Sequence, residues 1–113
     1  MGIGDWGLGI AGIGGGESSS CGAISISGGT ITATGGNFAA GIGSGCAAEN
    51  KSASCGNITI TSSVTRVTAT KGSGAPNSIG KGTAENNATN TCGTVTIGGN
   101  VGAITDSPYT YQP

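Results

Sequence analysis

A three-part sequence motif is repeated three times along this chain, and this repeat limits the possible folds more than any other feature. Its parts are A-G-I-G, then C-G-x-I/V-x-I, then T/V-x-A-T-G/K-G, the last of them shortened in the third copy. Such repetition is typical of stacked units, each of which buries its apolar face against its neighbours. The sequence therefore predicts a single repeat domain, with repeats at about 9–38, 39–75 and 76–105 and a C-terminal cap at 106–113.

The composition limits what such a domain can have as a core. Of 113 residues, 25 are glycine, whereas aromatic residues make up 4% and charged residues 8%. Collagen would require a Gly-X-Y period, which is absent, and a disordered chain would lack the alternating Ile, Val and Thr runs seen here. We therefore expect a narrow core of stacked Ile, Val and Ala side chains.

Charge and hydropathy exclude several kinds of partner. The formal net charge is -1, and the basic residues are dispersed at Lys51, Arg66, Lys71 and Lys81. A nucleic-acid-binding protein needs a basic stripe, so no nucleic-acid partner is expected. No apolar run reaches the roughly 18–20 residues of a membrane span, and no signal peptide is recognisable after Met1. We expect this chain to be part of a larger protein that is extracellular or on the cell surface.

Three short strands are expected in each repeat. Apolar and hydroxyl residues alternate in two segments of each complete copy, and a single isoleucine between glycines forms a third, shorter side. The segments in the first two copies are 12–14, 24–26, 30–34, 41–43, 58–60 and 64–70. This pattern favours an all-β fold with essentially no helix: a short right-handed parallel β-helix, or β-solenoid, of about three coils. A β-prism-like fold with three internal repeats is the alternative.

Polar loops emerge before the cysteine in the second and third copies, at 46–52 and 83–90. Loops at one edge of a solenoid are the usual place for function. The candidate ligand-facing residues are Glu17, Glu49, Asn50, Glu85, Asn86 and Asn87. A column of these carboxylates would hold Ca²⁺ or act on a glycan, but their spacing from the preceding isoleucine differs between copies. Three separate solvated acids are therefore the favoured interpretation, and no cofactor is required.

Three of the four cysteines occupy one repeat position, and stacking would place them in a column: Cys21, Cys55 and Cys92. Adjacent strands lie about 4.8 Å apart, within the Cα range of a disulfide, so a Cys21–Cys55 or Cys55–Cys92 bond is geometrically allowed. A structural ladder of buried free thiols is the favoured interpretation. Cys46 lies out of register and would either pair with Cys55 or remain free.

Bulky side chains gather near the chain ends, and we expect them to cap the stack. They are Trp6 and Leu8 at one end, and Pro108, Tyr109, Tyr111 and Pro113 at the other. An aromatic platform for sugar rings is the less favoured interpretation.

The residues needed for common catalytic centres are missing. Histidine is absent, so no Ser-His or Cys-His nucleophile can form, and no C-x-x-C pair suggests a metal site. Acid–base chemistry would depend on the loop carboxylates alone. We expect no catalytic site, no metal centre and no enzyme activity; a polysaccharide lyase or hydrolase fragment is the weakest hypothesis.

The phrases at 28–36, 40–45 and 55–60 resemble the glycine-rich GGTVTATGG, GAGIGSG and CGTITI repeats of surface or secreted proteins of gut Bacteroidales and Firmicutes. The segment from Val64 to Pro113 is similar to the C-terminal part of such arrays. The resemblance implies a β-solenoid, an extracytoplasmic setting and a gut bacterial source. It carries over no catalytic or binding residue, and the loops here are rich in Ala, Glu and Asn where that family often has a Tyr.

Together these features predict a structural or adhesive β-solenoid module of a bacterial surface or secreted protein. A carbohydrate-binding module, assisted by Ca²⁺, is the alternative. The expected partners are further copies of the chain in a homo-oligomer, or neighbouring repeats of a larger chain. Glycans are the other expected partner.

Overall fold

The computed structural model describes residues 9–113, and that part of the chain is all-β with no helix. Consequently it contains no helix that is long and apolar enough to cross a membrane. The expected cap residues Trp6 and Leu8 lie outside the described residues. The strands are β1 (Ile13–Gly14), β2 (Ile24–Ile26), β3 (Thr30–Thr34), β4 (Ile42–Gly43), β5 (Ser52–Cys55), β6 (Ile58–Ile60), β7 (Arg66–Thr70), β8 (Ile79–Gly80), β9 (Thr89–Cys92), β10 (Val95–Ile97), β11 (Asn100–Val101) and β12 (Tyr109–Tyr111).

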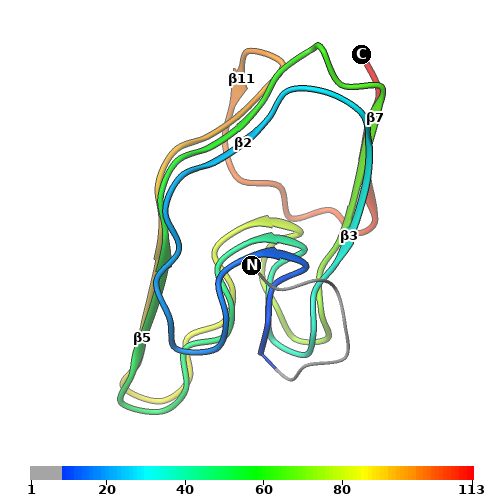
Figure 1. The fold of residues 1–113 in the computed structure, drawn as a ribbon. Coiled ribbons are helices and arrows are strands. Elements are labelled where there is room, and N and C mark those ends of the chain that lie inside the picture. Colours follow the sequence, from blue (N-terminus) through cyan, green and yellow to red (C-terminus); the bar gives the residue numbers. More distant parts are fainter. Residues whose placement is uncertain (1–8) are drawn as a thin grey trace.

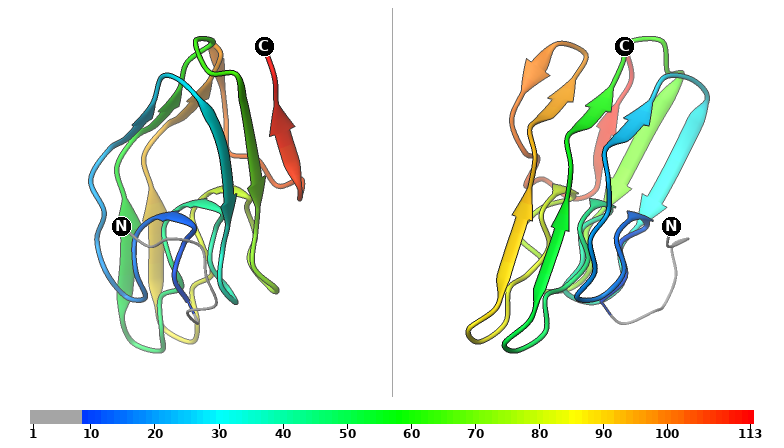
Figure 2. Two further views of the ribbon diagram at one scale, coloured as in Figure 1. Left: turned by 45° about the vertical axis from the view of Figure 1, so that its right-hand side comes forward. Right: turned by 60° about the vertical axis from the view of Figure 1, so that its left-hand side comes forward.

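Equivalent strands of successive repeats pair in parallel and in register. The short strands form the order β1-β4-β8, and the strands after the cysteines form the order β2-β6-β10. The long strand β3 pairs with β7 over its whole length. In Figure 1 the three repeats trace nearly the same path, one behind another, and Figure 2 shows their strands side by side. The repeated phrase therefore corresponds to stacked layers.

A fourth pairing, between β5 and β9, was not expected from the sequence, and each of its strands begins within a segment that was expected to be a polar loop, 46–52 or 83–90. The two strands are parallel and in register, with Ala53 opposite Asn90 and Cys55 opposite Cys92. Their inward positions alternate with exposed Ser and Thr, which is the period of a half-buried strand. The loops are consequently shorter than predicted, and Cys55 and Cys92 are each the last residue of a strand.

The chain after β10 turns back and covers one end of the stack with antiparallel segments. β11 pairs antiparallel with β10, and Ile104 forms an antiparallel bridge with Ile79. β12 runs antiparallel along β7, beside it in both views of Figure 2, at the position a third long parallel strand would take. On the side of the third repeat, three of the four sheets therefore end in a strand or bridge that runs antiparallel to the other strands of the sheet.

Rows of aliphatic side chains form the core, one row for each sheet. Ile42 stands between Ile13 and Ile79, and Ile58 stands between Ile24 and Val95. The middle member of each row is fully buried. Burying an aliphatic side chain of this size stabilises the fold by about 1.5–3 kcal/mol, so these rows replace the large aromatic core that the composition lacks.

The short strands approach one another so closely that only glycine fits beside the isoleucine. A Cβ atom placed on Gly43, whose φ is +140°, would lie 1.8 Å from the carbonyl oxygen of Gly80. Gly14 has the same relationship to the carbonyl oxygen of Gly43. In the first two repeats, the glycine after the isoleucine is therefore required by the contact between layers.

Candidate functional site

The three loop carboxylates are exposed and do not form a column. Between the second and third repeats, Ala47 bridges Ala84 and Ser52 lies opposite Thr89. This register places Glu49 level with Asn86, whereas Glu85 is level with an alanine. Glu85 and Glu17 both affect the Cys46 thiol, whose pKa is raised first by burial and then by the negative charge of these two carboxylates. Residues 9–113 contain no group of three His, Cys, Asp or Glu side chains that could hold a metal ion.

The loop asparagines form the tips of two equivalent turns. Asn50 and Asn87 have φ values of +62° and +59°, and asparagine is among the residues that adopt this left-handed conformation most readily. The backbone N–H of Asn50 donates to the carbonyl oxygen of Asn86 at 3.0 Å, so the two turns stack. The side chains of all three residues are exposed. Figure 1 shows both turns projecting at the lower left of the fold.

The cysteines at the common repeat position lie in a column through the three layers. Cys55 and Cys92 are opposite one another in β5 and β9, and the Cys55 Sγ donates a hydrogen bond to the Cys92 Sγ at 2.9 Å. Cys21 continues the column, because its N–H donates to Ser54 and its carbonyl accepts from the N–H of Gly56. Cys46 is buried elsewhere. None of the four is in a disulfide.

The hydrogen bond between Cys55 and Cys92 shifts the pKa values of the two thiols in opposite directions. The hydrogen bond from the Cys55 thiol lowers the pKa of Cys92. The same hydrogen bond, together with burial, raises the pKa of Cys55. Cys92 is therefore the thiol of this pair that ionises first, and a thiolate is the reactive form of cysteine.

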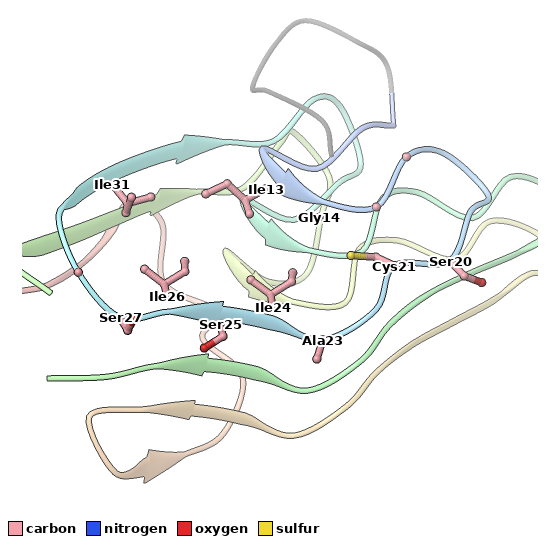
Figure 3. A pocket seen from close by; sticks show the side chains of 13 residues that line it. Ile13, Gly14, Ser20, Cys21, Ala23, Ile24, Ser25, Ile26, Ser27 and Ile31 are labelled. Atoms are coloured by element: carbon pink, nitrogen blue, oxygen red, sulfur yellow. The ribbon is translucent and has the colours of Figure 1, made fainter. Parts of the chain in front are cut away.

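A hollow of about 810 Å³ opens at the end of the stack formed by the first repeat. It is lined only by residues of that repeat, and Figure 3 shows Ile13, Ile24, Ile26 and Ile31 converging on it, with Cys21 at its margin. Ser25, on the same strand as two of these isoleucines, points to the opposite side. This hollow therefore places an apolar surface beside the Cys21 thiol.

A second hollow, of about 530 Å³, lies against the third repeat and includes Cys92, Lys81 and Asn90 in its lining. Asn90 is buried, and its Nδ2 donates to the carbonyl oxygens of Gly45 and Thr83 at 2.8 Å each. Its Oδ1 accepts a hydrogen bond from the hydroxyl group of Ser44. This network joins the second and third repeats, and it satisfies polar groups whose burial without partners would be costly.

Sequence reasoning missed this network because it placed Asn90 in a loop. The signal lay in the alignment of S-A-S-C at 52–55 with T-N-T-C at 89–92. That alignment puts Asn90 at the inward position that Ala53 occupies in the preceding repeat.

The tyrosines of the C-terminal segment cover the core. Tyr109 and Tyr111 are half-buried and pack against the aliphatic cluster, whereas Pro108 and Pro113 are exposed. Burial raises the pKa of Tyr109, with a smaller contribution from Tyr111. The rings therefore do not form a fully exposed stacking surface.

A row of hydroxyl groups crosses the outer face of the sheet formed by β3, β7 and β12. Thr32 lies opposite Thr68, and Thr68 lies opposite Thr110, with 3.5 Å between the hydroxyl oxygens of the last pair. Thr34 and Thr70 form a shorter parallel row. These rows give one face of the molecule a regular array of donors and acceptors.

The fold and these surfaces define a class, an all-β protein whose sequence repeats stack layer on layer. No protein-family model, curated protein or solved structure matches the chain.

Proposed function

We propose that this chain is a structural or adhesive β-solenoid module of a bacterial surface or secreted protein, and that it has no catalytic activity. The module is a short right-handed parallel β-helix that is closed at one end. Parallel, in-register pairing between repeats supports the solenoid over the β-prism alternative, since each layer continues the sheets of the layer before it.

One observation carries the proposal: equivalent core residues are covered on one side of the stack and open on the other. In the second repeat, Ile42 and Val67 are 0% exposed, whereas their counterparts Ile13 and Ile31 in the first repeat are only half-buried. In the third repeat Ile79 is again 0% exposed, because the returning C-terminal segment covers it. Among residues 9–113, the half-buried core isoleucines at these positions therefore belong to the first repeat.

The same face also presents unpaired backbone groups. β1, β2 and β3 are edge strands, and within residues 9–113 no strand pairs with their outer sides. An open edge of this kind is a template for another strand. This surface therefore combines apolar side chains with backbone N–H and C=O groups that are available to pair with another strand.

The occupant that fits this face is another copy of the repeat, supplied by a neighbouring segment of a larger chain. β2 and β3 offer outward the same backbone edge that β6 and β7 offer to them, in the same register. A further A-G-I-G, C-G-x-I-x-I and T-x-A-T phrase would therefore continue every sheet. Without such a neighbour, we expect copies of the chain to associate through this face. An extracellular or cell-surface location, in gut bacteria, is part of the proposal and rests on the resemblance of the repeats.

The proposal can be tested by adding a repeat at either end. A variant with a second copy of residues 39–75 ahead of Gly9 should unfold at a higher urea concentration, because the added layer buries the core side chains of the first repeat. Light scattering should still show association, now through the open face of the added repeat. The matched control carries the same copy after Pro113, where β11 and β12 already cover the core, and should show no stabilisation. Equal stabilisation by both additions would refute the proposal that the first repeat is the open end. If the unmodified chain is a stable monomer, its proposed self-association through this face is wrong.

A carbohydrate-binding module is the second candidate, and the hydroxyl rows on β3, β7 and β12 favour it. Hydroxyl groups spaced regularly on a rigid sheet suit the hydroxyl groups of an extended glycan. A glycan array, probed with and without Ca²⁺, is the test. We would expect Thr32→Val to weaken any binding, and Thr59→Val, on a different sheet, to leave it unchanged. Failure to bind any glycan would exclude this candidate.

A further inference from the structure

We propose that Cys55 and Cys92 are a disulfide-forming site, in which Cys92 attacks the oxidant and Cys55 completes a covalent bond between the second and third repeats. The proposal concerns two thiols that the structure holds together in the reduced state. It does not depend on the module function or on the location proposed above.

The backbone already has the geometry that the bond requires. Cys55 and Cys92 are directly opposite in two parallel strands, where neighbouring Cα atoms lie about 4.8 Å apart. That spacing lies within the usual Cα range of disulfides, about 4.4–6.8 Å. The Sγ atoms are 2.9 Å apart and point toward each other. Side-chain rotation alone can therefore bring them to bonding distance, and the strands need not move.

The two thiols differ in access, and this difference assigns their roles. Cys55 is 7% exposed and enclosed between the layers, whereas Cys92 is half-buried and lines the 530 Å³ hollow. A small disulfide can therefore reach Cys92 but not Cys55. The hydrogen bond that lowers the pKa of Cys92 acts in the same direction, since it favours the thiolate on the accessible residue.

The oxidant is a low-molecular-weight disulfide of the glutathione class, RSSR. The Cys92 thiolate attacks one sulfur of RSSR, which breaks the S–S bond, releases RS⁻ and leaves a mixed disulfide on Cys92. Cys55 then loses its proton to water and attacks the Cys92 Sγ, which expels the second RS⁻. The protein loses two electrons and two protons in all, and RSSR becomes two RSH.

The other two cysteines remain thiols in this scheme. Cys21 is next in the column, but no hydrogen bond joins its Sγ to Cys55, and it lines the opposite hollow. Cys46 is 2% exposed and belongs to another part of the core. One covalent link between the second and third repeats and two free thiols are therefore expected in the oxidised chain.

The positions of the basic residues allow a direct test. Trypsin cleavage after Lys51, Arg66 and Lys81 puts Cys55 on the peptide 52–66, Cys92 on 82–113, and both remaining cysteines on 1–51. The full chain is reduced, freed of reductant, incubated with oxidised glutathione, alkylated and digested without reduction. Mass spectrometry should find 52–66 linked to 82–113 and two alkylated cysteines on 1–51. A main link between 52–66 and 1–51, or alkylation of all four cysteines, would overturn the proposal.

Two variants test the order of attack. Cys55→Ala should accumulate the glutathione adduct on Cys92, because the second thiol is missing, whereas Cys92→Ala should show no adduct on Cys55. Cys21→Ala is the matched control and should form the same cross-link as the unmodified chain. An adduct that forms faster on Cys55 than on Cys92 would refute the assigned roles. If either variant fails to fold, the peptide map of the unmodified chain still decides whether the bond forms.

Discussion

Tyr111 lies opposite Val67 in an antiparallel pair, so the last strand of the chain covers the second repeat where a third parallel strand would otherwise stand. This relationship closes one end of the stack, and its counterpart is missing from the described part of the other end. The proposed module function depends on this difference between the two ends. An end whose strands are already paired and whose core is already covered cannot bind a further repeat.

Tyr111→Ala should destabilise the fold by removing part of this cover. The side chain is half-buried against the core, so we expect the free energy of unfolding to fall by about 2 kcal/mol, less than for a fully buried aromatic residue. Urea denaturation measures the change. Thr110→Ala alters the exposed side of the same strand and should change stability by less than about 0.5 kcal/mol. Equal effects of the two substitutions would show that the tyrosine ring contributes no cover.

Gly43→Ala should prevent the layers from stacking. The new methyl group would overlap the carbonyl oxygen of Gly80, which is a backbone atom fixed within the next layer. We expect loss of the native circular dichroism spectrum. Gly29→Ala is the control: its φ of +81° carries strain of about 1–2 kcal/mol, but nothing lies within 4 Å of the added Cβ. That variant should fold with reduced stability, and a folded Gly43→Ala protein would contradict the close contact.

Stability should decline at high pH through Tyr109. Burial raises its pKa above the ordinary value of 10.0 in the folded chain. The unfolded chain therefore loses this proton first, and the stabilisation present below pH 10 is lost as the pH rises through the folded pKa. Urea denaturation at a series of pH values should show a weaker decline for Tyr109→Phe. Thr110→Ala should keep the full decline, and an unchanged profile in Tyr109→Phe would assign it to other groups.

Oxidation should stabilise the chain if Cys55 and Cys92 form the proposed bond. The two residues are 37 positions apart, and closing a loop of that size in the unfolded chain adds about 4 kcal/mol to the free energy of unfolding. Urea denaturation of the oxidised protein, with and without reductant, measures the difference. Cys92→Ala should show no response to reductant. An oxidised protein no more stable than the reduced one would indicate a strained bond or none.

Much of the candidate site was accessible to sequence reasoning, because repetition identifies equivalent positions. The shared position of Cys21, Cys55 and Cys92 predicts a column, and the structure places them in successive layers. The loop acids were less predictable. Their contacts depend on the register between loops of unequal length, and that register puts Glu49 beside an asparagine and not beside another carboxylate.

The sequence by itself determined the all-β class, the absence of helix in residues 9–113 and the identity of the inward isoleucines, since alternation and glycine spacing are local properties of the chain. Only the tertiary structure decided that residues 89–92 form a strand, that the segment after β10 returns antiparallel, and that no strand within residues 9–113 pairs with the outer edges of the first repeat. Each of these depends on which distant strand supplies the hydrogen bonds. A strand edge accepts a parallel or an antiparallel partner, and the choice is made by packing between segments far apart in the chain.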